Sequence, residues 1–133
     1  MAEMSGKVIR YNLETEIKHG IQVSNLAYAV GMELGLSKEQ CYDLVVAGML
    51  HDIGKLRLTR YVSGEKNPLV IEEIKYVRRH TQLGCEFLKN RGYEKSVLEA
   101  IYYHHENYDG SGYPENLEGE NIPLSSRILR VCD

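Results

Sequence analysis

The sequence has 133 residues, of which 43% are hydrophobic, which suits one compact domain and leaves no length for a second. The net charge of -3 excludes a broadly basic surface for binding duplex nucleic acid. No apolar run approaches the ~20 residues of a membrane span, and residues 1–12 lack the features of a signal peptide. With three scattered cysteines, which suit a reducing compartment, these features predict a cytoplasmic protein with a lead-in at 1–12 and one domain at 13–133.

The N-terminal half of the domain has helical periodicity. Apolar residues recur at three- and four-residue intervals over residues 13–34, which predicts a long helix. Ser37 and Gln40 have the spacing of a capping box and predict the start of a second helix. We expect this helix to reach about Ile53 and to stop at Gly54.

The rest of the chain is also predicted to be helical, with no strand signal. The expected elements are a loop at 56–66, one helix or two meeting near His80 between Asn67 and Gly92, a helix capped by Ser96 and Glu99 that reaches His104, a turn-rich segment at 106–121, and a last helix opened by Pro123. The pattern therefore predicts an all-α domain of about five to seven helices.

The histidines are the most informative residues for function. The chain has five of them: His19, His51, His80, His104 and His105. One inward-facing histidine is usually a hydrogen-bonded core residue, but five unpaired imidazoles in a small helical domain would each carry a desolvation penalty. Imidazole nitrogens and carboxylate oxygens are ligands for first-row metals, so a shared metal centre explains the set better.

Two local patterns point to the same chemistry. In the first, HDIGK at 51–55, adjacent His51 and Asp52 can chelate and the carboxylate can bridge two ions, while Lys55 places a cation beside them. In the second, HHENYDGSGYP at 104–114, two neighbouring imidazoles precede a glycine-punctuated loop. Neither segment carries a Ser-His or Cys-His signature, which fits attack by a metal-activated water.

These motifs resemble a known family. HDIGK at 51–55 looks like the HDxGK motif of HD-domain phosphohydrolases, and its combination with HHE at 104–106 and DGSGYP at 109–114 resembles the HD-GYP subgroup of bacterial cyclic di-GMP phosphodiesterases. The resemblance extends from about Thr15 to Asp133. It implies an HD-domain helical bundle and hydrolysis of cyclic di-GMP, or a related cyclic dinucleotide, to pGpG, with complete cleavage to GMP left open.

The resemblance also implies roles for individual residues. One metal site would be formed by His19, His51, Asp52 and Asp133, and a second by Asp52, His80, His104 and His105. The ions would be iron or manganese. Asp52 and Lys55 would serve catalysis, and the substrate would lie against Lys55, Asp109, Gly112, Tyr113 and Pro114. Tyr113 and Tyr108 are predicted to be better placed for base stacking than Tyr102 and Tyr103.

The sequence departs from the family at two places. Some members hold a third metal with a glutamate at the position of Thr15; Glu14 and Glu16 flank this position but are expected to point away around the helix. We therefore predict two metal ions. Family members also continue past the position of Asp133, so the bundle is expected to lack its usual C-terminal helices.

Two other readings stay open. One is an HD hydrolase of a different phosphate ester, against which the GYP loop at 112–114 argues. The other is a non-catalytic signalling module that docks a diguanylate cyclase domain, against which the complete ligand set argues. A homodimer is also compatible with the sequence. Metal content and turnover of cyclic di-GMP separate these readings.

Overall fold

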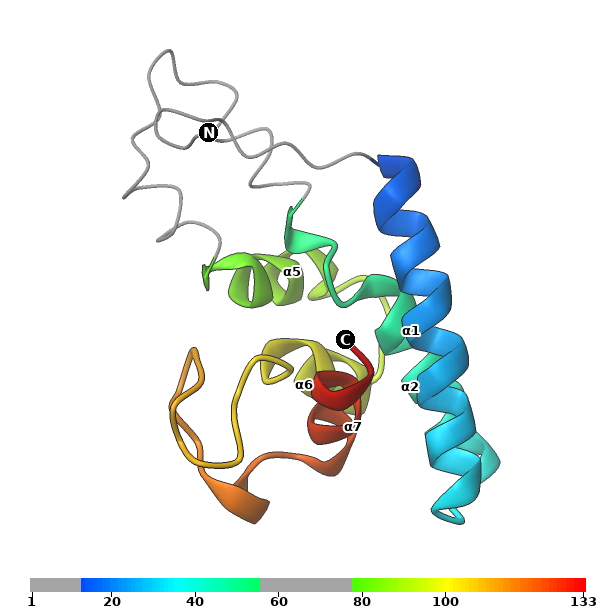
Figure 1. Ribbon diagram of the computed structural model, residues 1–133. Coiled ribbons are helices and arrows are strands. Elements are labelled where there is room, and N and C mark those ends of the chain that lie inside the picture. The colour runs from blue at the N-terminus through cyan, green and yellow to red at the C-terminus, as the bar shows by residue number, and fades with distance from the viewer. Residues whose placement is uncertain (1–12, 56–77) are drawn as a thin grey trace.

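The computed structural model describes residues 13–55 and 78–133. Within these ranges the fold is all-α, as predicted, with no β-strand (Figure 1). Its elements are the α-helices α1 (Leu13–Glu33), α2 (Lys38–Leu50), α5 (His80–Leu88), α6 (Lys95–Tyr102) and α7 (Leu124–Cys132), and the 3-10 helix η1 (Gly119–Asn121). The predicted loop at 56–66 and the helix start at Asn67-Pro68 lie outside the described residues.

Helices α1 and α2 form an antiparallel pair joined by a short turn. Helix α1 ends in a Schellman motif. Gly35 adopts the left-handed backbone conformation, with a φ of +78°, and the amide of Leu36 donates to the carbonyl of Gly31. Helix α2 then begins with the predicted capping box: the Ser37 hydroxyl accepts from the Gln40 amide, and the Gln40 side chain accepts from the Ser37 amide. The local sequence thus fixes the turn.

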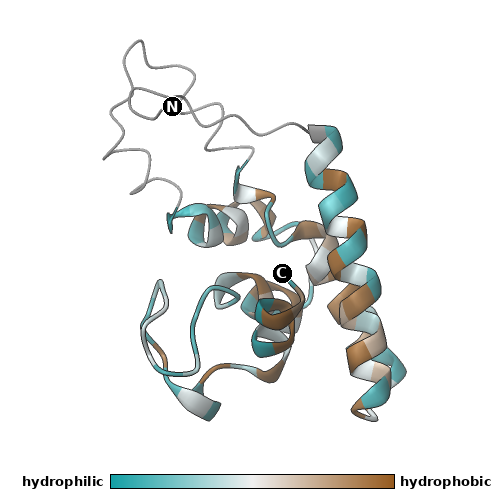
Figure 2. Ribbon diagram, viewed as in Figure 1, coloured by the Kyte–Doolittle hydropathy of each residue, from teal (hydrophilic) through white to brown (hydrophobic). Residues whose placement is uncertain are grey.

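The hydrophobic core joins this pair to the C-terminal helices. Its buried members are Val23, Ala27, Leu44, Ala47, Leu88, Val97, Ala100, Ile101, Ile128 and Leu129. All five α-helices therefore contribute to one core. The long segment between α6 and α7 is largely hydrophilic, whereas both of these helices carry hydrophobic residues (Figure 2). None of the described helices is long and apolar enough to cross a membrane.

Three helix boundaries differ from the expectation. Helix α2 ends at Leu50, before Ile53, so residues 51–53 lie in a turn. Helix α5 ends at Leu88, before Gly92. Helix α6 ends at Tyr102, which leaves His104 in the turn that follows.

The predicted cap of α6 is also wrong. Glu94 is the N-cap residue, with an extended backbone, and the helix begins at Lys95. Ser96 does not cap, because its hydroxyl donates to Asp43 Oδ2 of α2 at 2.7 Å. A charge-assisted bond between two helices has replaced the local one.

Candidate metal centre

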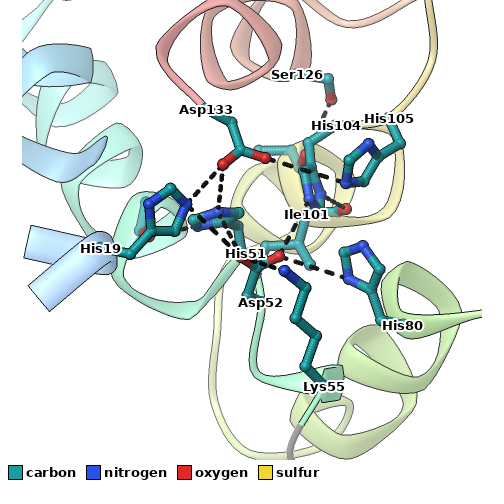
Figure 3. Close-up of polar contacts among 12 residues, drawn as sticks. His19, His51, Asp52, Lys55, His80, Ile101, His104, His105, Ser126 and Asp133 are labelled. Carbon is teal, nitrogen blue, oxygen red and sulfur yellow. Dashed lines mark hydrogen bonds and ion pairs between the residues drawn. The ribbon is translucent and has the colours of Figure 1, made fainter. Parts of the chain in front are cut away.

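The predicted metal ligands converge on one point, although they come from five separate segments of the chain (Figure 3). His19 lies on α1; His51 and Asp52 lie in the turn after α2; His80 is the first residue of α5; His104 and His105 lie in the turn after α6; and Asp133 follows α7. Most of them therefore lie at helix ends, where side chains from several helices can meet.

Close packing of α1 on α2 brings His19 to this point. A Cβ atom added to Gly48 would lie 2.8 Å from the hydroxyl and 2.9 Å from the Cα of Ser24, so glycine is needed there. The Ser24 hydroxyl donates to the carbonyl of Val45 at 2.7 Å across the same contact. The helices therefore touch through their backbones, and His19 lies beside the end of α2.

A second close approach brings in His80. A Cβ atom on Gly54 would collide with the carbonyl oxygen of His80 and would lie 2.8 Å from the amide nitrogen of Gly84. The role of Gly54 is thus different from the predicted helix stop. It allows the start of α5 to rest directly on the turn that carries Asp52, because only a residue without a side chain fits between them.

Two imidazoles are held in a fixed tautomer by backbone carbonyls. Nδ1 of His51 donates to the carbonyl of Gly48 at 2.6 Å, and Nδ1 of His104 donates to the carbonyl of Ile101 at 2.6 Å. A carbonyl oxygen only accepts, so Nδ1 carries the proton in each ring. The Nε2 atoms therefore face the centre, in the arrangement usual for metal-binding histidines.

The atoms that face the centre are buried and lack hydrogen bonds. No hydrogen-bond partner is found among the described residues for Nε2 of His51 and His104, Nδ1 of His80, or either side-chain oxygen of Asp52. Burying such atoms without partners is costly, and imidazole nitrogens and carboxylate oxygens are donors that divalent first-row metals accept. The donor set therefore fits a metal centre.

Asp52 lies between two groups of potential ligands. Its Oδ2 is 3.1 Å from Nε2 of His51, while its Oδ1 is 3.6 Å from Nδ1 of His80 and 3.7 Å from Nε2 of His104. One group contains His19, His51, Asp52 and Asp133; the other contains Asp52, His80, His104 and His105, with the ligand atoms of each group within 4.8 Å of one another. The two oxygens of Asp52 thus face different groups.

Asp133 closes the first group. Its Oδ1 lies 2.6 Å from Nε2 of His19 and 3.4 Å from Nε2 of His51, and its Oδ2 lies 4.0 Å from Nε2 of His105. The amide of Asp133 donates to the carbonyl of Leu129, which holds the residue against the end of α7. The carboxylate therefore spans from the first group toward the second.

Burial and neighbouring charges separate the pKa values of the site. Burial and the nearby His104 lower the pKa of His80 to about 3 and that of His105 to about 4, so both rings are neutral at pH 7. Burial also acts to lower the pKa of His51, but the nearby carboxylates of Asp133 and Asp52 outweigh it and raise this pKa to about 10.

The two carboxyl groups keep their charge. Burial acts to raise the pKa of Asp52, but His104, His51 and Lys55 hold it well below its usual range. The pKa of Asp133 is likewise lowered against the effect of burial, chiefly by His51. Both groups are therefore anionic at pH 7, as metal ligands must be.

Lys55 lies at the edge of the centre. Its Nζ is 3.2 Å from Oδ2 of Asp52, and the side chain is 22% exposed. The ammonium group thus lies beside the Asp52 carboxylate and remains accessible from solvent. This position suits contact with an anionic ligand of the centre.

The loop after α6 is anchored by Glu106, a residue to which the sequence had given no role. Its carboxylate is 1% exposed and accepts hydrogen bonds from the amides of Glu115, at 2.6 Å, and Leu117, at 2.7 Å. The sequence signal that could have pointed to this anchor is an acidic residue directly after two histidines and before a glycine-rich loop. Glu106 connects the turn of His104 and His105 to residues 112–117.

Residues 112–114 lie directly against this turn. A Cβ atom on Gly112 would collide with backbone atoms of His105 and Asn107, and the amide of Tyr113 donates to the carbonyl of His105. The ring of Tyr113 is half-buried and stacks on His105, with centroids 5.0 Å apart and planes 9° apart. Pro114 follows through a cis peptide bond. The structure therefore places this loop beside the second group of ligands.

The structure gives the surroundings of three tyrosines and of Asp109, which the sequence had considered for substrate binding or packing. Tyr108 is 62% exposed, whereas the Tyr113 ring is covered on His105. Asp109 accepts from the amide of Ser111 at 2.9 Å and from its hydroxyl at 2.6 Å, so the carboxylate closes a turn at the surface. The Tyr102 hydroxyl donates to Glu115 and so connects α6 to the loop.

Glu16 lies differently from the expectation. It lines a pocket of about 200 Å³ together with His51 and Asp52, and its Oε1 is buried without a hydrogen-bond partner among the described residues. The helix position alone had suggested that this side chain would point away. The end of α2 packs close to the first turns of α1, so a carboxylate at this position reaches inward.

Comparisons with known proteins agree with this geometry. The profile of the HD domain family matches residues 3–133. The cyclic di-GMP phosphodiesterase response regulator RpfG of Xanthomonas campestris is 40% identical over 115 residues, which cover 84% of this chain and 30% of that protein. The 3′3′-cGAMP-specific phosphodiesterase 1 of Vibrio cholerae is 32% identical over 133 residues, covering all of this chain and 31% of that protein.

A solved structure supports the fold. Bd1817, an HDG"Y"P protein from Bdellovibrio bacteriovorus, superposes with a TM-score of 0.70 at 21% identity and covers 93% of this chain and 41% of that chain. The chain thus spans about a third of the length of the curated relatives that it matches. The family profile covers nearly the whole sequence, and the helical architecture is shared. The chain belongs to the HD domain family.

Proposed function

We propose that this chain is the catalytic part of a metal-dependent phosphodiesterase that hydrolyses cyclic di-GMP. The observation that carries the proposal is the position of Asp52, whose two oxygens face separate groups of histidines. Relatives that span nearly the whole chain are named cyclic di-GMP phosphodiesterases. A centre of this kind is suited to hydrolysis at phosphorus.

Two divalent ions, iron or manganese, are proposed to occupy the two groups and to share Asp52. When bound, such a pair lowers the pKa of a water molecule and stabilises both the attacking and the leaving oxygen in an in-line displacement. The fixed tautomers of His51 and His104 keep their Nε2 atoms oriented toward the centre. Neutral His80 and His105 are ready to coordinate at pH 7 without losing a proton.

Lys55 is proposed to contact the scissile phosphate. Its ammonium group lies 3.2 Å from the Asp52 carboxylate and is partly exposed, so it can donate to a non-bridging phosphate oxygen while staying beside the centre. A cation placed where negative charge develops lowers the barrier for phosphoryl transfer. Lys55 and Asp52 are therefore the proposed catalytic residues of the chain.

The loop at 112–114 is proposed to hold the dinucleotide. Gly112 allows the loop to lie against His105, Tyr113 covers that imidazole, and Pro114 follows on the same surface. Asp109 lies further out and closes the turn that precedes them. Direct contact of Asp109 with the substrate stays a prediction, as do a homodimer and a diguanylate cyclase partner.

A second candidate substrate is 3′3′-cGAMP. The relative that aligns with every residue of this chain is named for that nucleotide. Both molecules are cyclic dinucleotides with two phosphodiester bonds, so the proposed metal centre serves either one. The two molecules differ in one base.

The proposal is tested by incubating the anaerobically purified, manganese-loaded protein with cyclic di-GMP, 3′3′-cGAMP and a panel of other phosphate esters. We expect hydrolysis of a cyclic dinucleotide, with pGpG as the first product from cyclic di-GMP. Progress curves show whether pGpG accumulates or continues to GMP. Metal-loaded protein that cleaves other phosphate esters and neither dinucleotide would contradict the proposed substrate class.

A further inference from the structure

Tyr113 lies at the edge of the metal centre and is surrounded by positive charge. Its ring stacks on His105, and the side chain is half-buried. Burial raises the pKa of its hydroxyl group, and the charges of Arg78, Lys55 and Arg130 act against this rise. These three cations come from distant parts of the chain.

Arg78 approaches from the segment before α5. Its guanidinium carbon lies 5.5 Å from the centroid of the Tyr113 ring, within the range of a cation–π contact. The side chain is exposed. Stacking on an aromatic ring orients the planar guanidinium and leaves its N–H groups, which lie around the rim of the plane, available to a ligand.

Arg130 approaches from α7, one turn before Asp133. Its Nε donates to Oδ1 of Asn107 at 2.8 Å, and Nδ2 of Asn107 donates to the hydroxyl of Ser111. This chain of bonds ties α7 to the loop after α6 and holds an exposed arginine beside it. Asn107 follows His105 by two residues, so this bond holds Arg130 close to the second group of ligands.

The local charge matters because the whole chain does not attract anions. Its net charge is -3, and the centre itself contains the carboxylates of Asp52 and Asp133. Lys55 serves the phosphate at the metal ions in the proposed function, but a cyclic dinucleotide carries a second phosphate. Arginine is the side chain best suited to bind it, because its forked N–H groups match two phosphate oxygens.

We propose that Arg78 and Arg130 form a subsite, beside Tyr113 and the loop after α6, for the phosphate that is not cleaved. This inference rests on the proposed function and deepens it. The two arginines would select substrates with two phosphodiester groups over those with one. They bind and orient the substrate, and they contact neither the metal ions nor the attacking water.

The test compares two substrates that share the reaction but differ in the second phosphate: cyclic di-GMP and bis(p-nitrophenyl) phosphate. Arg78→Gln and Arg130→Gln are each expected to raise KM for cyclic di-GMP about tenfold, in line with losing one charge-assisted contact at a partly exposed site, and the double variant should raise it by up to about 100-fold. For bis(p-nitrophenyl) phosphate, kcat/KM should stay within about twofold. Metal content should not change.

The matched control is Arg91→Gln. Arg91 also lies over an aromatic ring, 4.5 Å from the centroid of Phe87, but it follows the end of α5 that is opposite His80. This variant should leave both substrates unaffected. Equal losses on both substrates in the Arg78 and Arg130 variants, or no loss on cyclic di-GMP, would overturn the subsite.

Binding of cyclic di-GMP, measured by calorimetry on the same proteins, separates this inference from the proposed function. If the unmodified protein binds cyclic di-GMP without hydrolysing it, the proposed function is wrong, and about tenfold weaker binding by the two variants still supports the subsite. Unchanged binding by the variants contradicts it. Absence of any binding by the unmodified protein overturns both.

Discussion

Asp52 is the residue on which the centre depends, because its carboxylate is common to both groups of ligand atoms. Its neighbours keep it charged despite burial. His51 and His104 complete the arrangement by donating their Nδ1 protons to carbonyls within the chain. The chemistry of these ligands predicts how metal retention depends on Asp52 and how His51 exchanges its proton.

Replacement of the bridging carboxylate should remove metal from both groups. We expect Asp52→Asn to lower metal content and to reduce phosphodiesterase activity by more than about 100-fold, since even indirect partners of metal ligands contribute 10- to 100-fold. Elemental analysis and turnover measure the two effects. Asp43→Asn, which changes a carboxylate of α2 that bonds Ser96, is the control and should retain metal. Full metal content in Asp52→Asn would contradict a bridging role.

Metal binding should release protons from His51. In the metal-free fold its pKa is raised from 6.5 to about 10, so the ring is protonated at pH 7, whereas coordination through Nε2 requires the neutral form. Manganese affinity should therefore rise with pH through the neutral range. Calorimetric titration in buffers of different ionisation enthalpy measures the released protons. Affinity that falls as the pH rises from 6.5 would contradict this assignment.

The same shift determines how His51 affects the metal-free fold. A folded-state pKa above the unfolded value means that the protonated ring stabilises the fold fully below about pH 6.5. This contribution is lost as the pH rises toward 10. Bound metal should reduce the dependence, because the ring is then neutral in the folded state.

At the scale of elements, two contacts help to place the ligands. The start of α5 packs on the turn after α2, and the loop after α6 is held by hydrogen bonds to Glu106. The first depends on a missing side chain at Gly54 and the second on a buried carboxylate at Glu106. Neither residue is a predicted ligand. Each can therefore be changed while every ligand is kept.

A methyl group at Gly54 should displace His80. We expect Gly54→Ala to destabilise the protein by about 1–3 kcal/mol and to weaken metal binding in the group that contains His80, because the added Cβ meets the His80 carbonyl. Gly84→Ala is the matched control. Its Cβ would find only ordinary contacts at 3.4 Å or more from the same interface. Urea denaturation and metal titration measure both variants; equal behaviour of the two would contradict the steric argument.

Loss of one acceptor at Glu106 should loosen the loop. Glutamine offers one carbonyl oxygen where the carboxylate accepts from two amides, so we expect Glu106→Gln to cost about 1–3 kcal/mol of stability. Activity should fall as well, because Tyr113 and His105 are held by this loop. Glu120→Gln, an exposed change in η1, is the control. Unfolding curves that coincide with those of the unmodified protein would show that Glu106 is not an anchor.

Much of this fold could be predicted from local sequence signals. The helix at 13–34 and the capping box at Ser37 depend on nearby residues, and the structure agrees with both. The end of α2 and the start of α6 do not depend on nearby residues alone. Ser96 bonds a residue of another helix, and Leu50 ends α2 where the chain turns toward the centre. Contacts between distant segments decided these boundaries.

The site shows the same division. The histidines and Asp52 could be named from their motifs, because ligand chemistry restricts the residue types. The anchoring role of Glu106 and the inward position of Glu16 depend on which segments pack together. Periodicity was also insufficient for the core: Ile17, Ile21 and Leu26 are about half exposed, although they recur at helical spacing.

At the scale of the whole molecule, the core and the centre hold the same helices together. The core joins all five described α-helices, and the centre joins α1 to the ends of α2, α5, α6 and α7. Several side-chain nitrogen and oxygen atoms that are buried at this junction have no hydrogen-bond partner among the described residues. Bound metal should therefore stabilise the fold as a whole, because it binds only where these helix ends meet.

The most direct measurement of the central claim is the metal content of protein purified without oxygen and analysed by elemental mass spectrometry. The account predicts about two divalent ions per chain, one for each group that shares Asp52. Folded protein, shown by circular dichroism to be helical, that contains no metal and binds none when iron or manganese is added would contradict it.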